Sequence, residues 1–337
     1  MARAGVQLVL HSDRTVRLEE YPIPEPGSRQ ILVAVARSYV SAGSEMNFFR
    51  HNPPDGPPRS AVVGYMTVGR VEAVGPGVEG FVPGDRVLTC GNHCSHWLVD
   101  LDDTGHMRWY IERLDDAVAD DVAGFAILGD VALHGIRRAA LQIDQSVAVL
   151  GAGIVGQLTI QFARLSGTHP IIATDLHATR LEKARQSGAT HAIDAGTTDT
   201  ARAIREITAG MGAEVVFHCT PVPQVLQTAM EVAAERGTVV LSGSPPGTAT
   251  IGLQAELLRR ELTILGNYES GLTAPHPYWP WTRQRNRRAC LRLMATGQLQ
   301  LQHLVTHVVP YTGAQRMFDL MLDGPGGDWL GVVFSWD

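Results

Sequence analysis

Cysteine and charge are both scarce in this sequence. Its 337 residues include four cysteines, 18% of the residues are charged, and the net charge is −6. So few cysteines exclude a disulfide-dense scaffold and fit a reducing cytoplasm. The mild acidity argues against a polyanion-binding surface, so we expect no nucleic-acid partner.

Long apolar runs are absent as well, since none reaches the length that spans a membrane. The opening residues, MARAGVQLVLHSDRTV, have no long apolar core and meet a charge at Asp13. We therefore expect no signal peptide, no membrane contact and a cytoplasmic location.

The pattern of apolar and turn-forming residues changes near residue 119. Before it, short β-like runs such as Ile31–Ala36 are separated by proline and glycine. After it, strand-like and helical patterns alternate, which predicts an α/β fold with a parallel sheet covered on both faces. We expect a β-rich domain at 1–118, an inserted dinucleotide-binding domain at 119–268 and a return to the first domain at 269–337. The expected strands of the inserted domain are 146–150, 170–174, 191–194, 214–219, 237–241 and 262–266. A helix at 283–296, a strand at 304–309, a helix at 312–322 and a strand at 331–334 are expected after them.

A glycine fingerprint, GAGIVG, begins at Gly151. It lies between a strand-like run and residues repeating at helical spacing, which is the context of a dinucleotide-binding turn. Gly151 would allow the tight turn, Gly153 would let the backbone approach a pyrophosphate, and Gly156 would let the helix pack close to the strand. The helix N-terminus adds free N–H groups and a positive dipole end for the phosphates.

A carboxylate, Asp175, ends the second strand of this pattern. It can accept hydrogen bonds from both ribose hydroxyls and would repel a 2′-phosphate, so NAD(H) is expected in preference to NADP(H). No arginine immediately follows it, and Arg180 on the next helix could flank the adenine. The expected cofactor contacts are Gly151, Gly153, Ile154, Val155, Gly156, Asp175, Leu176, Arg180, Thr220, Ser242, Gly243 and Asn267.

Three motifs together resemble one family. They are GYMTVGRV at 64–71, VPGDRV at 82–87 and the glycine fingerprint with Asp175. The chain resembles the medium-chain dehydrogenase/reductase superfamily, in particular its zinc alcohol dehydrogenase-like group. The resemblance implies a β-rich GroES-like catalytic domain with an inserted Rossmann dinucleotide-binding domain. It also implies a homodimer joined through the edge strand at 262–266.

The family's catalytic zinc ligands are replaced here. The resemblance puts Ala42 in the cysteine slot, Tyr65 in the histidine slot and Leu128 near the third slot, with Asp130 close to it but alone. Alanine cannot coordinate a metal, so no catalytic zinc is expected. The chain is similar to a zinc-free branch that includes bacteriochlorophyllide a dehydrogenases and oxidoreductases of biosynthetic clusters. This implies a zinc-independent interconversion of a secondary alcohol and a ketone, in a biosynthetic pathway.

A second set of potential ligands lies in CGNHCSH. Cys90, His93, Cys94 and His96 have a spacing that can bind zinc. The same stretch also matches the family's ordinary hairpin before a strand at 96–99. We expect thiols and imidazoles lining a loop, and metal binding stays an alternative.

Proton transfer requires a group beside the substrate oxygen. Tyr65, in the zinc-ligand slot, is the first candidate for polarising that oxygen, and Ser44 matches the family's hydroxyl relay. Asn47 stands where many members have a relay histidine. Asp130 and His134 share a helical face and could form a buried acid–imidazole pair or a structural hydrogen bond. Each hydroxyl could alternatively have only a packing or turn-stabilising role.

An aromatic segment, HPYWPW, offers a candidate substrate pocket. Its rings with polar tips suit a ring-shaped or mixed polar substrate, although a subunit contact or a loop on the core fits equally. The expected pocket residues are Glu45, His276, Tyr278, Trp279 and Trp281.

Two other functions stay open. Zinc-free members of the superfamily often reduce activated C=C bonds as enoyl or quinone reductases, usually with NADPH, a preference that Asp175 opposes. A non-catalytic nucleotide-binding protein is the third reading, which Ser44 and Tyr65 disfavour.

Overall fold

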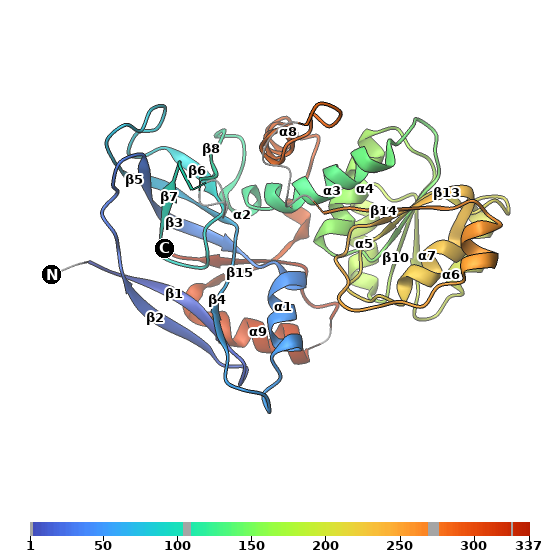
Figure 1. Cartoon of the computed structure of the whole chain (residues 1–337), viewed down its shortest axis with the longest axis horizontal. Helices are drawn as coiled ribbons and strands as arrows, with labels where there is room; N and C mark the ends of the chain where they lie inside the picture. Colours follow the sequence, from blue (N-terminus) through green and yellow to red (C-terminus); the bar gives the residue numbers. More distant parts are fainter. Residues whose placement is uncertain (1–2, 104–108, 269–275, 325) are drawn as a thin grey trace. The chain divides into compact units, whose positions relative to one another are not determined.

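The computed structural model describes residues 3–103, 109–268, 276–324 and 326–337. The chain divides into two compact units (Figure 1). The first comprises Met1–Ile127, Met294–Thr296 and Val305–Asp337, and the second comprises Leu128–Leu293 and Gly297–Leu304.

The first unit is built on two sheets. The smaller one has the order β2-β1-β4, and the larger one runs β15-β16-β3-β5-β6-β8, with β7 pairing with β3. The long strand β3 is thus hydrogen-bonded to β5, β7 and β16. The strands are β1 (Ala4–His11), β2 (Val16–Pro22), β3 (Gln30–Tyr39), β4 (Ser60–Val62), β5 (Thr67–Val74), β6 (Arg86–Thr89), β7 (His96–Asp100), β8 (Ile111–Arg113), β15 (Val305–Pro310) and β16 (Gly331–Ser335).

Helix α1 (Ala42–His51) lies on an apolar core that joins distant parts of the sequence. Met46 and Phe49 of α1 pack there with Phe318 of α9 (Ala314–Asp323) and Phe334 of β16. Because these apolar side chains fix one face of α1 against the core, its opposite face, including Ser44, is exposed.

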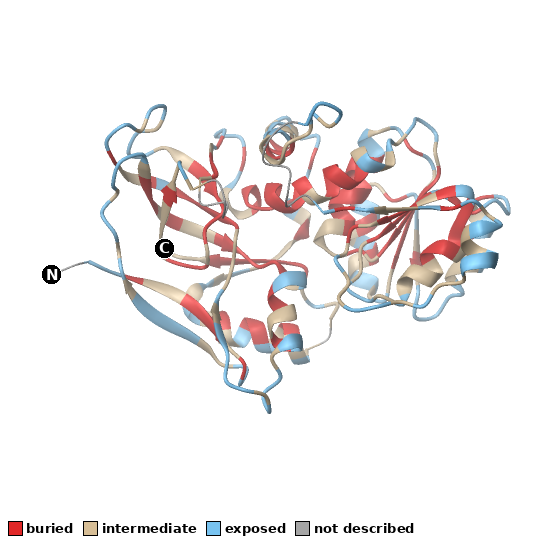
Figure 2. Cartoon of the chain, in the orientation of Figure 1, coloured by how far each residue is buried: buried red, intermediate tan, exposed pale blue. Residues whose placement is uncertain are grey.

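The second unit is a parallel six-stranded sheet in the order β11-β10-β9-β12-β13-β14. All four residues of the central strand β9 are buried, as both faces of such a sheet are covered. The middle of the sheet is accordingly drawn in the colour of buried residues in Figure 2. Ala148 and Leu150 of β9 pack in a core with Ile204 of α6 and Met230 of α7. The strands are β9 (Val147–Leu150), β10 (Ile171–Asp175), β11 (His191–Asp194), β12 (Ala213–His218), β13 (Ala233–Leu241) and β14 (Thr263–Gly266). The helices are α3 (Ala126–Ala139), α4 (Ile154–Leu165), α5 (Ala178–Ser187), α6 (Thr200–Ile207), α7 (Val225–Val232) and α8 (Arg283–Ala295), with short helical turns at Leu253–Leu258 and Gln302–Leu304. A further short turn, Tyr311–Gly313, belongs to the first unit.

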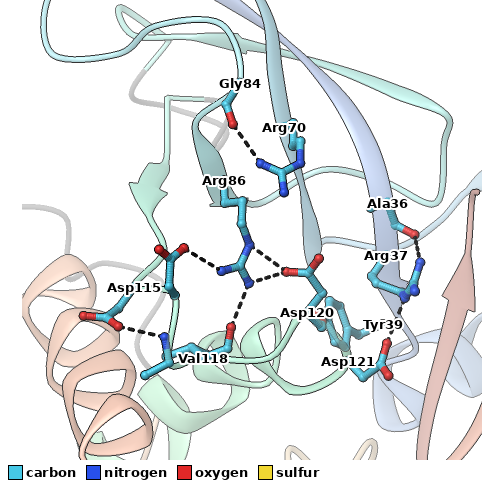
Figure 3. A network of polar contacts seen from close by, with 12 residues as sticks. Ala36, Arg37, Tyr39, Arg70, Gly84, Arg86, Asp115, Val118, Asp120 and Asp121 are labelled. Carbon is cyan, nitrogen blue, oxygen red and sulfur yellow. Dashed lines mark hydrogen bonds and ion pairs between the residues drawn. The ribbon is translucent and has the colours of Figure 1, made fainter.

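The predicted fold class is confirmed, since a β-rich unit is interrupted by a parallel α/β unit. The division by contacts differs from the expected boundaries at both ends of the insertion. At the first end, α2 (Asp120–Ala123) stays with the β-rich unit because Arg86 donates to Asp120 and to the Val118 carbonyl (Figure 3). Arg37 of β3 also pairs with Asp121 at 2.8 Å.

At the second end, most of α8 stays with the α/β unit. Asn286 of α8 donates to Asp130 of α3 at 2.8 Å, so buried polar contacts tie the two helices together. In the described part of the chain, no helix has the length and apolar character needed to cross a bilayer.

Candidate active site

Three hydroxyl groups meet at the N-terminal end of α1 in the first unit. The Tyr65 hydroxyl donates to Ser41 Oγ at 2.5 Å, and Ser41 Oγ donates to Ser44 Oγ at 3.2 Å. The oxygen atoms of Tyr65 and Ser44 lie 3.4 Å apart. The two hydroxyl residues singled out in the sequence are therefore neighbours, and Ser41 joins them into one hydrogen-bonded cluster.

Ser41 is a site residue that sequence reasoning missed. It precedes the first residue of α1, the position where serine is a common N-cap, although its side chain makes no capping hydrogen bond to the helix. Its side chain is engaged by Tyr65 instead. The available signal was its place three residues before Ser44 in the same motif, but the contact with Tyr65 joins residues 24 positions apart.

A buried polar network lies next to this cluster. Glu45 is 3% exposed, and one of its oxygens accepts from the Ser41 backbone N–H at 2.8 Å. Its other oxygen lies 3.2 Å from Nε2 of the fully buried His93, whose Nδ1 lies 2.6 Å from Ser38 Oγ. Ser38 also accepts from the Trp336 indole N–H at 2.9 Å. Glu45, expected to line the substrate pocket, is instead held inside the protein by these partners.

The four residues of CGNHCSH have different surroundings. His93 faces Glu45, whereas Cys94 donates through Sγ to the His96 carbonyl at 3.0 Å. His96 lies 3.1 Å from Glu72, and Cys90 is buried. Burial raises the pKa of the Cys94 thiol to about 12, which opposes the thiolate form that binds metals. Over the described ranges of the chain, no group of three or more His, Cys, Asp or Glu side chains is arranged to hold a metal ion.

Asn47 lies one turn beyond Ser44 on α1. Its side-chain oxygen accepts from Arg50 Nη1 at 3.0 Å, so its described side-chain contact runs along the helix surface. The proposed catalytic role of Asn47 stays a prediction.

The glycine fingerprint forms the turn between β9 and α4 in the second unit. Gly151 has a φ of +96°, and a Cβ on Gly156 would lie 2.0 Å from the Gly151 carbonyl oxygen. These values explain the turn and the close approach of helix to strand. At Gly153, which precedes α4, a Cβ would meet nothing within 4 Å. The backbone of Gly153 and the first N–H groups of α4, beginning with Ile154 and Val155, are therefore open to a phosphate group.

Asp175 lies at the end of β10, next to this turn. Its carboxylate accepts from the backbone N–H groups of Ala152 at 2.8 Å and His177 at 3.0 Å. Burial lowers the pKa of Arg180, and the nearby Asp175 carboxylate opposes that shift. Leu176 is 66% exposed beside them. The carboxylate is thus fixed in place, and its remaining lone pairs are available to hydroxyl donors.

The remaining expected cofactor residues lie at the carboxyl ends of β12, β13 and β14. A Cβ on Gly243 would lie 2.2 Å from the Thr220 carbonyl oxygen, so these two loops touch. Asn267 donates to Ser242 Oγ and to the Val131 carbonyl, both at 3.0 Å. The buried side-chain oxygen of Asn267 accepts no hydrogen bond from the described residues. This edge of a parallel sheet is where nucleotide ligands bind in open α/β folds.

Asp130 is bound by α8 rather than by His134, which corrects the expected acid–imidazole pair. The Asp130 carboxylate is fully buried and accepts from Asn286 Nδ2 at 2.8 Å, and Arg287 Nε lies 3.4 Å from it. A guanidinium and an amide stabilise a buried carboxylate better than a neutral imidazole does, which explains why Asp130 contacts α8 and not His134.

His134 packs its ring edge-on against Trp279, with 5.5 Å between the ring centroids. Its Nδ1 is buried without a hydrogen-bond partner among the described residues. Burial, followed by the positive charges of Arg138 and Arg137, lowers the pKa of His134 to about 4. The imidazole is therefore neutral at pH 7.

The aromatic segment, residues 276–281, lies in the second unit. Tyr278 is 81% exposed, and its ring centroid lies 3.9 Å from that of His276. Trp281 lies between two arginines, Arg137 of α3 and Arg285 of α8. The segment therefore contacts α3 and α8 through its tryptophans while its first aromatic pair faces solvent.

Two family models match the chain in comparisons with known proteins. Residues 27–119 match the alcohol dehydrogenase GroES-like domain, and residues 155–282 match the zinc-binding dehydrogenase model. Sorbitol dehydrogenase of Homo sapiens is 27% identical over 350 residues, which cover 96% of this chain and 94% of that protein.

Solved structures are similar over nearly the whole chain. An Escherichia coli CFT073 protein described as a short chain alcohol dehydrogenase and complexed with NADH has a TM-score of 0.82 at 20% identity, and 98% of this chain and 99% of that chain are covered. A Sinorhizobium meliloti 1021 protein of the zinc-binding dehydrogenase type, bound to NADP, has a TM-score of 0.81 at 23% identity, with 99% of each chain covered. These similarities establish the fold, and they leave the choice between NAD and NADP to the residues of this chain.

Proposed function

The chain belongs to the zinc alcohol dehydrogenase-like group of the medium-chain dehydrogenase/reductase superfamily, and from this premise we propose that it interconverts a secondary alcohol and a ketone with NAD(H) and without a catalytic zinc ion. The observation that carries the proposal is the hydrogen-bonded chain of the Tyr65, Ser41 and Ser44 hydroxyls. It supplies a proton path in the unit that the family uses for catalysis.

The turn between β9 and α4 fits a dinucleotide. The open backbone at Gly153 and the N-terminus of α4 would hold the pyrophosphate, and the fixed Asp175 carboxylate would hold the adenosine ribose. A 2′-phosphate next to Asp175 would suffer charge repulsion, which supports NAD(H) over NADP(H). When bound, the nicotinamide ring supplies the hydride acceptor or donor.

The donor set does not fit a catalytic zinc ion. The side chains in the three ligand slots are the methyl group of Ala42, the phenol of Tyr65 and the isobutyl group of Leu128. Two of these have no donor atom, whereas a catalytic zinc site needs about three protein ligands. We therefore assign the polarisation of the substrate oxygen to Tyr65.

The hydroxyl chain would move one proton in alcohol oxidation. The substrate hydroxyl passes its proton to the Tyr65 oxygen as Tyr65 passes its own proton to Ser41. Ser41 passes a proton to Ser44, and the exposed Ser44 releases one to water. Ketone reduction runs the same path in reverse, and Tyr65 then donates to the carbonyl oxygen.

The test is the conservative variant Tyr65→Phe, assayed on a panel of secondary alcohols, ketones, enones and quinones. The ring is kept and only the hydroxyl is lost, so we expect NADH binding to be unchanged and turnover to fall by about 10²- to 10⁴-fold. Tyr311→Phe, which removes a phenol hydroxyl elsewhere in the first unit and keeps the ring that stacks on Trp336, is the matched control and should retain full activity. Unchanged turnover in Tyr65→Phe on the best substrate would contradict the assignment, and activity confined to enones or quinones would favour a C=C reductase.

A further inference from the structure

Two buried polar side chains, Glu45 and His93, lie directly behind the hydroxyl chain of the first unit. One Glu45 oxygen accepts the Ser41 backbone N–H at 2.8 Å, and the other lies 3.2 Å from His93 Nε2. Both side chains are almost completely shielded from water, which costs free energy for an acid and an imidazole. The proposed proton path uses neither of them, so their burial needs another explanation.

The hydrogen-bond partners indicate where a neutral His93 carries its hydrogen. Ser38 Oγ accepts the Trp336 indole N–H at 2.9 Å, so its own O–H can donate to His93 Nδ1, 2.6 Å away. His93 Nε2 then carries the hydrogen and donates it to the Glu45 carboxylate. Each polar side-chain atom of this network has a partner, and the carboxylate is therefore held in one orientation.

Glu45 fixes the hydroxyl chain at Ser41. Ser41 directly precedes α1, and the Glu45 carboxylate binds its backbone N–H much as the glutamate of a capping box does. The Ser41 side chain caps no N–H group of the helix, and its hydroxyl accepts from Tyr65 instead. The carboxylate thus determines the backbone position of Ser41 and leaves its hydroxyl to the proton path.

His93 fixes the other end of this hydrogen bond, at Tyr65. The His93 backbone N–H donates to the Val63 carbonyl at 2.8 Å. Gly64, which directly precedes Tyr65, has a φ of +93°, and a Cβ there would lie 2.9 Å from the His93 ring, so ring and backbone are in close contact. One acid–imidazole pair therefore supports both partners of the hydrogen bond between Tyr65 and Ser41.

Stability alone does not explain this pair. The attraction between two buried polar groups repays their lost hydration only in part, and apolar side chains of similar volume often stabilise such a position equally well. Hydrogen bonds, in contrast, fix the orientation of the groups that they join. A proton path needs such precision, since a displacement of about 1 Å can lower a rate by about 10²-fold.

We propose that Glu45 and His93 are positioning residues, which hold the Ser41 and Tyr65 hydroxyls at hydrogen-bond distance without exchanging protons with the substrate. The inference rests on the proposed function and extends it to a pair outside the proton path. Turnover should therefore depend on the pair, whereas NADH affinity should not, because the dinucleotide turn belongs to the second unit.

The first experiment exchanges the pair for apolar residues of similar size, by Glu45→Leu combined with His93→Phe. Urea unfolding of this double variant should give nearly the native free energy of unfolding. Its kcat on the best substrate should nevertheless fall by about 10²-fold, with an unchanged Kd for NADH. Glu45→Gln should retain most of the native kcat, because its amide oxygen still accepts the Ser41 N–H. Glu72→Gln, which alters the acid–imidazole pair with His96, is the matched control.

The second experiment observes the Tyr65 hydroxyl without any reaction. Fluorotyrosine replaces Tyr65, and its fluorine NMR signal is recorded in the native background, in the double variant and in Ser38→Ala. We expect one narrow line in the native background and a shifted, broader line in both variants, because the phenol loses its fixed partner. Ser38→Ala removes only a hydroxyl bonded to His93, so it tests the same link if the double variant does not fold.

The outcomes separate this proposal from the proposed function. Unchanged fluorine lines in the variants that fold would overturn the positioning role, whatever happens to kcat. Native kcat in the folded double variant would also overturn it, provided that Tyr65→Phe lowers kcat. Tyr65→Phe added to the double variant should cause no further loss, and a full additional loss would show that the pair acts elsewhere. Changed fluorine lines with unaffected turnover in Tyr65→Phe would support the positioning role and refute the proposed function.

Discussion

Acidification should destabilise the protein through His134. Its folded pKa is about 4 because of burial and the charges of Arg138 and Arg137, whereas an ordinary histidine titrates near 6.5. Between these two pH values, His134 is protonated in the unfolded chain and neutral in the folded chain. The stability gained from the neutral imidazole is therefore fully present above about pH 6.5 and is lost as the pH falls toward 4.

The size of the effect follows from the shift. Complete protonation of His134 would lower the free energy of unfolding by about 3 kcal/mol, since each pKa unit is worth about 1.4 kcal/mol. Between pH 7 and pH 5 the expected loss from this one group is about 2 kcal/mol. Such a loss is a large part of the net stability of a typical domain, about 5–15 kcal/mol.

The variant His134→Phe isolates this term. Phenylalanine keeps an aromatic ring against Trp279 and cannot be protonated. Urea unfolding at a series of pH values should give a shallower pH dependence for the variant, with the two stability curves converging by about 2 kcal/mol from pH 7 to pH 5. His191→Asn, an exposed histidine of the same unit, is the control. Parallel curves for native protein and His134→Phe would refute the reasoning, because the imidazole would then titrate alike in both states.

Three further outcomes are expected. Asp175→Ser should remove both the acceptor for the ribose hydroxyls and the charge that repels a 2′-phosphate. In fluorescence titrations the affinity for NADH should fall and the affinity for NADPH should rise, each by roughly tenfold or more. Tighter binding of NADPH than of NADH by the native chain would contradict the NAD assignment. Dialysis against a chelator should leave turnover intact, because Ala42 and Leu128 offer no metal donors, and activity restored only by zinc would contradict this. Light scattering at micromolar concentration should give a dimer mass, because β14 is the edge strand of the six-stranded sheet, and a monomer mass at every concentration would argue against pairing there.

The fold was predictable because its signals are local. The apolar runs of the inserted domain, the glycine turn at Gly151 and the carboxylate at Asp175 each determine structure within a few neighbouring residues. The observed strands accordingly match the expected ones within a few residues, from β9 at Val147–Leu150 to β16 at Gly331–Ser335. The same locality made the positive φ at Gly151 and the tight packing at Gly156 predictable.

The partners of the site residues were less predictable, because they come from distant parts of the chain. The spacing of Asp130 and His134 suggested a pair, yet Asn286, 156 residues away in sequence, bonds to Asp130. The sequence suggested that His93 belongs to a cysteine–histidine cluster. Its partners in the structure are instead Glu45 and Ser38, which are 48 and 55 residues away in the sequence. No periodicity or short motif encodes contacts of this separation, so side-chain partners required the tertiary structure.

The pairing of β16 with β3 has a consequence for the order of folding during synthesis. The core of the first unit combines Leu8 and Met46 with Phe318 and Phe334, so the ribosome must complete nearly the whole chain before that core closes. The second unit uses mainly the continuous stretch Leu128–Leu293 and can collapse earlier. We therefore expect the strands of the first unit to stay unpaired while the second unit folds, and unpaired strand edges favour aggregation.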